Sequence, residues 1–305
     1  RLYQGLDKMR VLPIYRWQGG LLGSFVGQWL PQESTDPQSV LPYLQIGQSL
    51  IHYLVAKNQL SEQDWLNIYQ QYPNELKKAR SADLILVLLP LILYEHDSAR
   101  ELEQQIELVG FYWQKNPEII QNVLIYAYLC VLVLKEQFQT QQTLDHLIQV
   151  SQTRQISLSN QLGLVKDLLN NAVPLRQGMK QLISQGTSNQ IAIVLALYCF
   201  ISTPEDFQLS ILRAWQISEQ FPLSLALTGF LSGIYNGISG FPIRWRVATQ
   251  NFPLTPSIQQ KTVQLFTSWS GVYDPNAEYP LLKTSLAPVS VIQRRPLNIV
   301  SQESI

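Results

Sequence analysis

The sequence predicts an all-α fold, folded as a single compact multi-helix orthogonal bundle. Apolar residues recur at three- and four-residue spacing through most of the 305-residue chain, which is the period of an amphipathic helix. Alternating strand patterns joined by tight Asn-Gly or Asp-Gly turns are missing. The hydrophobic fraction of 46% is ample for a buried core, and no Pro/Gly/Ser-rich linker divides the chain.

Helix starts can be placed by their capping chemistry. Three sites put a side-chain acceptor at the N-cap and a proline at the first helical position: Asp36-Pro37, Asn116-Pro117 and Thr203-Pro204. Two pairs resemble capping boxes with Asp in place of Glu: Ser61 with Asp64, and Thr203 with Asp206. With the apolar periodicity, these signals predict helices over 14–30, 37–56, 61–72, 82–95, 98–114, 117–136, 140–151, 158–171, 175–185, 188–201, 204–218, 222–237 and 257–269.

The pattern predicts one helical domain over residues 14–270. Residues 1–13 form an N-terminal extension to it. After Ser270 the periodicity fades into a tail, residues 271–305, that proline punctuates repeatedly. We expect this tail to be irregular, and to wrap the surface or extend toward a partner.

Composition excludes several classes of function. Twenty-two basic residues balance twenty-two acidic ones, giving a net charge of +0, so nucleic-acid binding driven by counterion release has no support. The apolar runs 84–93, 123–134 and 191–201 are each shorter than the roughly 18 residues of a spanning helix. Because the sequence also shows no secretory segment, we expect a cytoplasmic protein that does not bind membranes.

The cysteines give no sign of a disulfide or a metal site. Cys130 and Cys199 lie in apolar runs, so neither a disulfide nor a zinc site is expected.

Two glycine stripes indicate close helix packing. One consists of Gly19, Gly23 and Gly27, and the other of Gly229, Gly233 and Gly237. Each glycine inside a helix costs up to about 1 kcal/mol relative to alanine, so three in one helix need a compensating gain. Close backbone approach of a neighbouring helix supplies one, and we expect each stripe to lie in a tight crossing.

Three separated segments, in this order, resemble the ADP-ribosylglycohydrolase family. Residues 18–28, QGGLLGSFVGQ, are similar to its opening G-x-x-x-G-x-x-x-G-D helix. The segment Leu89-Pro90-Leu91 is similar to the end of its G-N-G-x-x-M-R-x-x-P-L element. Residues 196–245, with the second glycine stripe and the closing Phe241-Pro242-Ile243-Arg244-Trp245, resemble its C-terminal half. The resemblance spans roughly residues 14–248 and implies the all-α bundle of that family.

The resemblance also implies a chemistry that the sequence departs from. The family binds two divalent metals, usually magnesium, and cleaves the glycosidic bond between ADP-ribose and a target, and paired metals suit that reaction. Its G-G-D-x-D-T element falls on residues 218–223, where Gln220 and Pro222 replace the aspartates. Gln28 replaces the aspartate that closes the opening motif, and residues 81–87, SADLILV, lack the asparagine and arginine of their element.

One aspartate remains near the family's (S/T)-D-D-T ligand group, in Thr35-Asp36-Pro37-Gln38. Asp36 is either a vestigial metal ligand or the N-cap of the helix beginning at Pro37, and we favour the cap. One carboxylate among neutral amides cannot offset the dehydration of two divalent ions. We therefore expect no magnesium site, no other cofactor and no catalytic residue.

The sequence favours an inactive relative that acts as a binding or regulatory module. Its partner is then a protein, or a small nucleotide-like ligand held in a vestigial cleft formed by Gln28, Asp36, Asp83, Glu219 and Gln220. Two alternatives stay open. One is a metal-independent or residual hydrolase using Asp36, Asp83 or Glu219, although Glu219 also suits an exposed helix end. The other is a structural helical scaffold for a protein partner.

Histidines and aromatic residues give weaker signals. His96-Asp97 and Asp145-His146 are adjacent pairs, and neighbours on a helix do not face one another, so neither is expected to be a dyad. Five aromatic residues could line a pocket for a flat ligand, although burial in the core is their more common position: Trp17, Trp29, Trp215, Phe221 and Trp245.

Overall fold

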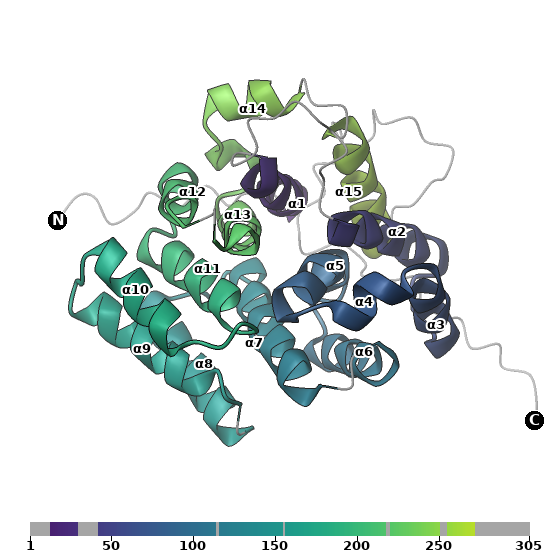
Figure 1. The fold of residues 1–305 in the computed structure, drawn as a ribbon. Coiled ribbons are helices and arrows are strands. Elements are labelled where there is room, and N and C mark those ends of the chain that lie inside the picture. The colour runs from purple at the N-terminus through teal and green to yellow at the C-terminus, as the bar shows by residue number, and fades with distance from the viewer. Residues whose placement is uncertain are drawn as a thin grey trace, which may run out of the picture.

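The fold is an all-α bundle, as predicted (Figure 1). The structure is a computed structural model and describes residues 13–29, 42–113, 116–154, 156–217, 220–250 and 255–271. Within these ranges it contains fifteen α-helices, one short 3-10 helix and no strand. The helices are α1 Pro13–Trp29, α2 Pro42–Lys57, α3 Glu62–Gln71, α4 Pro73–Lys78, α5 Ser81–Tyr94, α6 Ala99–Tyr112, α7 Pro117–Leu134, α8 Thr140–Thr153, α9 Ser159–Asn170, α10 Leu175–Gln185, α11 Ile191–Ser202, α12 Phe207–Trp215, α13 Pro222–Asn236, η3 Ile238–Gly240, α14 Ile243–Gln250 and α15 Thr255–Ser270.

Two predicted caps are confirmed. The Asn116 side chain accepts a hydrogen bond from the backbone N–H of Glu118 at 3.0 Å, with Pro117 as the first residue of α7. At the start of α3, Ser61 accepts from the N–H of Asp64, and the Asp64 carboxylate accepts from the N–H of Ser61 at 2.9 Å. Both caps satisfy backbone donors that a helix cannot satisfy internally.

The prediction for Thr203-Pro204 is wrong, because α12 begins later and is capped by Asp206. The Asp206 carboxylate accepts from the N–H of Leu209 at 2.8 Å. Tertiary hydrogen bonds hold the preceding segment as a loop: Ser210 Oγ donates to the carbonyl of Thr203 at 2.7 Å, and Asn236 Nδ2 to that of Pro204 at 2.8 Å.

Other boundaries differ in smaller ways. The expected helix over 61–72 ends at Gln71, and the unpredicted α4 follows it at once. The sequence also gives no signal for α14. Pro90, which interrupts an apolar run in the sequence, lies inside the continuous helix α5. The helix start expected at Asp36-Pro37, most of the extension over 1–13 and most of the tail over 271–305 lie outside the described residues.

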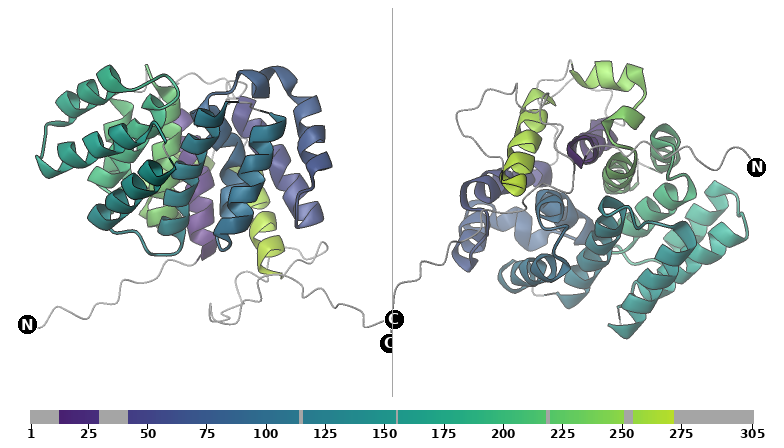
Figure 2. Two further views of the ribbon diagram at one scale, coloured as in Figure 1. Left: turned by 90° about the horizontal axis from the view of Figure 1, so that it is seen from below. Right: turned by 180° about the vertical axis from the view of Figure 1, so that it is seen from behind.

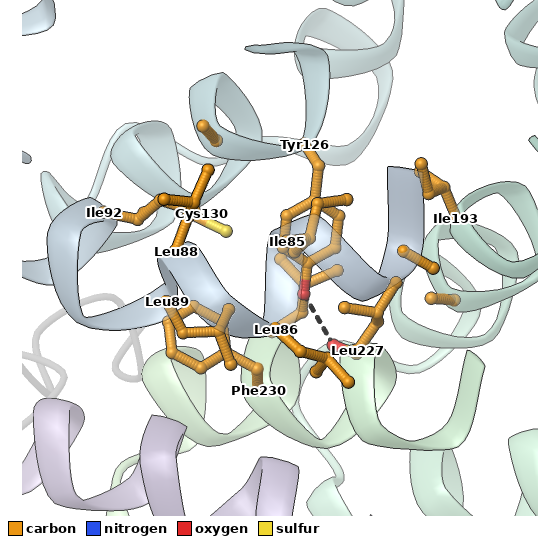
Figure 3. Packing of buried hydrophobic residues seen from close by; sticks show 14 of the residues in the cluster. Ile85, Leu86, Leu88, Leu89, Ile92, Tyr126, Cys130, Ile193, Leu227 and Phe230 are labelled. Atoms are coloured by element: carbon orange, nitrogen blue, oxygen red, sulfur yellow. Dashed lines mark hydrogen bonds between the residues drawn. The ribbon is translucent and has the colours of Figure 1, made fainter. Parts of the chain in front are cut away.

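Helix α5 is the centre of the core. All of its residues from Ser81 to Tyr94 are buried, and it packs against α2, α7 and α13 (Figure 1). Figure 3 shows Leu86 beside Leu227 and Leu89 beside Phe230, so α5 and α13 run in the same direction. The hydroxyl of Tyr126 on α7 donates to the carbonyl of Leu227 at 2.8 Å and ties a third helix to this pair. Cys130 and Cys199 are free and buried, and burial raises the pKa of Cys199 to about 12.

Helix α7 is the one described helix that is long and apolar enough to cross a membrane, judged by length and composition. The sequence expectation counted only its last twelve residues and so missed this property. In the structure 61% of the helix is buried within the protein, and α5, α6, α8 and α13 contact it. These contacts are those of a core helix.

Helices α1 and α13 cross at backbone contact, as the glycine stripes predict. Gly23 lies opposite Gly229, and Gly19 lies opposite Gly233. A Cβ atom on Gly23 would lie 2.8 Å from the carbonyl carbon of Gly229, which no side chain adjustment can relieve. Gly237 also lies against Gly19 in this crossing, where a Cβ atom on Gly19 would be 2.7 Å from the carbonyl carbon of Gly237. It ends α13 as well, with a positive φ of 64°, a conformation that favours glycine.

We predict that Gly23→Ala lowers the free energy of unfolding by about 3 kcal/mol, because the new methyl group collides with backbone. Gly163→Ala is the matched control. Gly163 is inside α9, and a methyl group added there would meet nothing within 4 Å, so alanine should raise stability by about 1 kcal/mol. Urea denaturation followed by circular dichroism measures both. Equal effects of the two substitutions would contradict the tight crossing.

Candidate functional site

The positions that the sequence assigns to the family's metal-binding motifs lie at helix ends. Gln28 is the penultimate residue of α1, and Ser81–Asp83 form the first turn of α5. Gln220 directly precedes the N-cap of α13, whose first residue is Pro222. Whether these positions meet depends on the directions in which the helices run.

The packing brings these ends to one side of the bundle. Since Gly19 lies opposite Gly233 and Gly27 opposite Leu225, α1 and α13 are antiparallel, and the last turn of α1 lies beside the first turn of α13. Helix α5 runs parallel to α13 (Figure 3), so it starts at the same end. Gly47 of α2 packs on Leu86 and Val87 of α5, and the Tyr94 hydroxyl at the end of α5 donates to Asn58 Oδ1, just after α2, at 3.2 Å. Helix α2 therefore runs parallel to α5 and starts near this end as well. We call this region the cleft end.

Asp83 is buried at the cleft end and caps its own helix. Its Oδ2 accepts from the backbone N–H of Arg80 at 2.9 Å and from Arg80 Nε at 3.4 Å. Burial raises the pKa of Asp83, and the hydrogen bonds and charge of Arg80 lower it by less. The carboxyl group is therefore engaged in helix capping, and its charged form is disfavoured.

Two polar side chains near the first turn of α5 were not predicted from the sequence. Tyr43 of α2 has a raised pKa, first through burial and then through the charge of Asp83. Asn122 of α7 donates from Nδ2 to Ser81 Oγ at 3.3 Å, while its buried Oδ1 has no hydrogen-bond partner. The spacing of Asp83, three residues after Arg80, is a signal that could have identified the cap. Nothing local in the sequence marks Tyr43 or Asn122.

The start of α13 offers no carboxylate among its described residues. Phe221 occupies the N-cap without a side-chain hydrogen bond, Pro222 follows it, and the first turn contains no acidic residue. Gln220 is exposed, and its backbone N–H donates to the carbonyl of Ile217 at 3.1 Å. The amino end of this helix is therefore left with its positive dipole uncompensated by the side chains described there.

The described residues of the cleft end do not fit a pair of divalent metal ions. Such ions require several hard oxygen ligands, mainly carboxylates. In the described ranges no group of three or more His, Cys, Asp or Glu side chains is placed to hold a metal, and the Asp83 carboxylate is engaged with Arg80. Asp36, Glu219 and the side chain of Gln28 lie outside what the structure describes.

The two histidines of the adjacent pairs contact other parts of the fold. His96 Nδ1 is 2.7 Å from the carbonyl oxygen of Leu93, and its ring packs on Trp17 and Trp269. His146 pairs with the hydroxyl of Tyr128, while Asp145 pairs with Lys166. Both histidines thus contact elements other than the neighbouring aspartate.

The aromatic residues considered for a flat-ligand pocket differ in their burial. Trp17 and Trp245 are buried in the core, and Phe221 is partly buried. Trp215 is 46% exposed on α12, while the side chain of Trp29 lies outside the described part of the chain. Burial accounts for most of these residues.

Comparison with known proteins agrees with the all-α fold. The sequence profile described as ADP-ribosylglycohydrolase matches residues 70–274. A solved structure of an "ADP-ribosylglycohydrolase-related protein complex" is similar with a TM-score of 0.58, at 15% sequence identity, over 83% of this chain and 98% of that chain. At that identity the likeness shows the fold. No curated protein matches the sequence.

We predict opposite pH responses for the two capping aspartates. The folded pKa of Asp83 is raised, so its contribution to stability falls as pH rises from the ordinary value of 3.8 toward the folded value. For Asp64, burial raises the pKa, but hydrogen bonds from Lys57 and Ser61 lower it by more. The stability that Asp64 contributes is therefore lost as pH falls through its folded pKa.

Urea denaturation of Asp83→Asn and Asp64→Asn across the acid range measures these contributions. The amide introduced by Asp83→Asn keeps an oxygen that can accept from the Arg80 N–H, so this variant should change stability at neutral pH by less than about 1 kcal/mol, whereas Asp83→Ala should cost about 1 kcal/mol. The stability lost in each asparagine variant, relative to the natural chain, should change with pH in opposite directions. A change in the same direction for both variants would contradict the opposite pKa shifts of Asp83 and Asp64.

Proposed function

Because this chain belongs to the ADP-ribosylglycohydrolase family, we propose that it is a catalytically inactive member that acts as a binding or regulatory module without the dinuclear metal site. The observation that carries the proposal is the loss of charge at the family's ligand positions. Gln28, Gln220 and Pro222 stand where the family has aspartates. Two divalent cations need anionic oxygens to replace their hydration shells, and neutral amides and a proline ring do not supply them.

The environment of Asp83 supports the proposal. This acidic side chain is at the cleft end, but its carboxyl group accepts two hydrogen bonds from Arg80. Burial also raises its pKa, whereas a metal ligand must be deprotonated. Asp83 is thus better suited to stabilising α5 than to catalysis.

The cleft end retains groups that can bind a neutral or nucleotide-like molecule. Helices α5 and α13 both start there, and the amino ends of helices attract phosphate oxygens. The first turn of α13 has no acidic side chain to compete with such a ligand. Gln28, Asp83 and Gln220 would add polar contacts. A small nucleotide-like ligand, or a protein partner at the same surface, is therefore the occupant that we propose.

Isothermal titration with magnesium chloride tests the central claim. We expect no saturable heat from the natural chain, and no release of ADP-ribose from ADP-ribosylated arginine in the presence of magnesium. The matched variant restores the charges through Gln28→Asp, Gln220→Asp and Pro222→Asp, and should gain magnesium affinity if these positions face one another. Saturable magnesium binding by the natural chain, or release of ADP-ribose, would overturn the proposal.

Thermal unfolding with ADP-ribose and EDTA tests the ligand. A ligand at 100 times its dissociation constant stabilises the folded state by about 2.7 kcal/mol, so we expect a rise in the melting temperature that EDTA leaves unchanged. Asp83→Asn keeps the cap of α5 and serves to ask whether this carboxyl contacts the ligand. A rise that EDTA abolishes would contradict metal-free binding.

A further inference from the structure

An elongated groove runs over helices α6, α7 and α8. It consists of two hollows with volumes of about 350 and 780 Å³. Both hollows are lined by Leu124 and Arg154, so they meet there. Ile120, Leu124 and Tyr128 form the floor at four-residue spacing along one face of α7. Three helices thus form a trough of the kind that receives another helix.

The α6 wall of the groove combines apolar and acidic groups. Phe111 stands at one end with 73% of its surface exposed. Glu103 and Glu107, one helical turn apart, line the same wall. Arg154 reaches over from the end of α8 and pairs with Glu103 at 2.6 Å. Glu107 is exposed, and its charge also acts on Arg154, so two glutamates and one arginine leave this wall with a net negative charge. The groove therefore suits an apolar helix that carries positive charge.

Helix α14 of the same chain has this character. Ile243 and Val247, one turn apart, are 71% and 52% exposed. Arg244 is exposed between them, Arg246 adds a second positive charge, and α14 contains no acidic residue. Buried Trp245 holds the helix against Phe207 of α12, with 6.1 Å between the ring centroids.

The groove and α14 lie on opposite sides of one molecule. Figure 1 shows α14 at the upper edge and α6 and α8 at the lower edge, and the view from behind in Figure 2 keeps this separation. The helix therefore does not reach the groove of its own molecule, whereas a second copy can present it. Such a contact joins two different surfaces, so it is heterologous and can continue head to tail.

We propose that α14 of one copy docks into the groove formed by α6, α7 and α8 of another copy. Ile243 and Val247 cover the apolar floor beside Phe111, and Arg244 approaches Glu107. The match of apolar surface with apolar surface, and of arginine with glutamate, is the reason for choosing a second copy as the occupant. This inference is independent of the proposed function, because neither surface includes residues of the cleft end.

Sedimentation velocity of the full chain over a concentration series provides the test. The variants are Phe111→Glu in the groove and Ile243→Glu on α14, which replace side chains of nearly equal exposure and so should leave the fold intact. Each should weaken self-association about tenfold or more. Leu209→Glu changes a 41% exposed apolar residue on α12 and is the control, with wild-type association expected.

Mixing the two variants distinguishes this contact from other modes of association. Phe111→Glu retains an intact α14 and Ile243→Glu retains an intact groove, so an equimolar mixture should form a dimer and grow no further. A wild-type chain that stays monomeric would overturn the proposal, as would a mixture that stays monomeric or a Leu209→Glu variant that loses association to the same degree. Circular dichroism of each variant verifies that the helices are retained.

Discussion

The close contact between the backbones of α1 and α13 sets the positions of the other central helices. It joins an early helix to a late one, with Gly19 and Gly23 facing Gly233 and Gly229. Because no side chains separate the two helices, their relative position is fixed closely. The antiparallel arrangement sets the end of α1 beside the start of α13, and α5 packs against that pair. The cleft end exists because of this contact.

Helices α1 and α13 pack through one set of residues and carry the family's ligand positions on another. The ligand positions can therefore change without altering the packing of the two helices. The glycines contact one another along the middle of the crossing, whereas Gln28 and Pro222 are at the ends. Replacing a carboxylate at an end removes charge and leaves the interhelical packing alone. In our proposal, the chain has kept the scaffold of its family in this way while its ligand positions have become neutral.

Hydrogen bonds outside the helix itself decide where α12 begins, which capping rules leave ambiguous. Thr203-Pro204 has the chemistry of a helix start, yet Ser210 and Asn236 bind the carbonyl groups of these two residues. Helix α12 consequently begins at Phe207 behind the Asp206 cap. The cap of α5 is local by contrast, since Asp83 accepts from the N–H of Arg80 three residues earlier.

Residue patterns along the chain were sufficient to predict the helical class, the tight glycine crossing, the caps at Ser61 and Asn116 and the family resemblance, because each depends on residues a few positions apart. They also located the motif positions Gln28, Asp83 and Gln220, but not that three helix ends meet there. Only the packing of the helices brings those ends together, and it also places Tyr43 near Asp83 and Asn122 beside Ser81. The same packing forms the groove, where Arg154 of one helix pairs with Glu103 of another. Such contacts depend on the directions in which packed helices run, and spacing along the chain does not encode those directions.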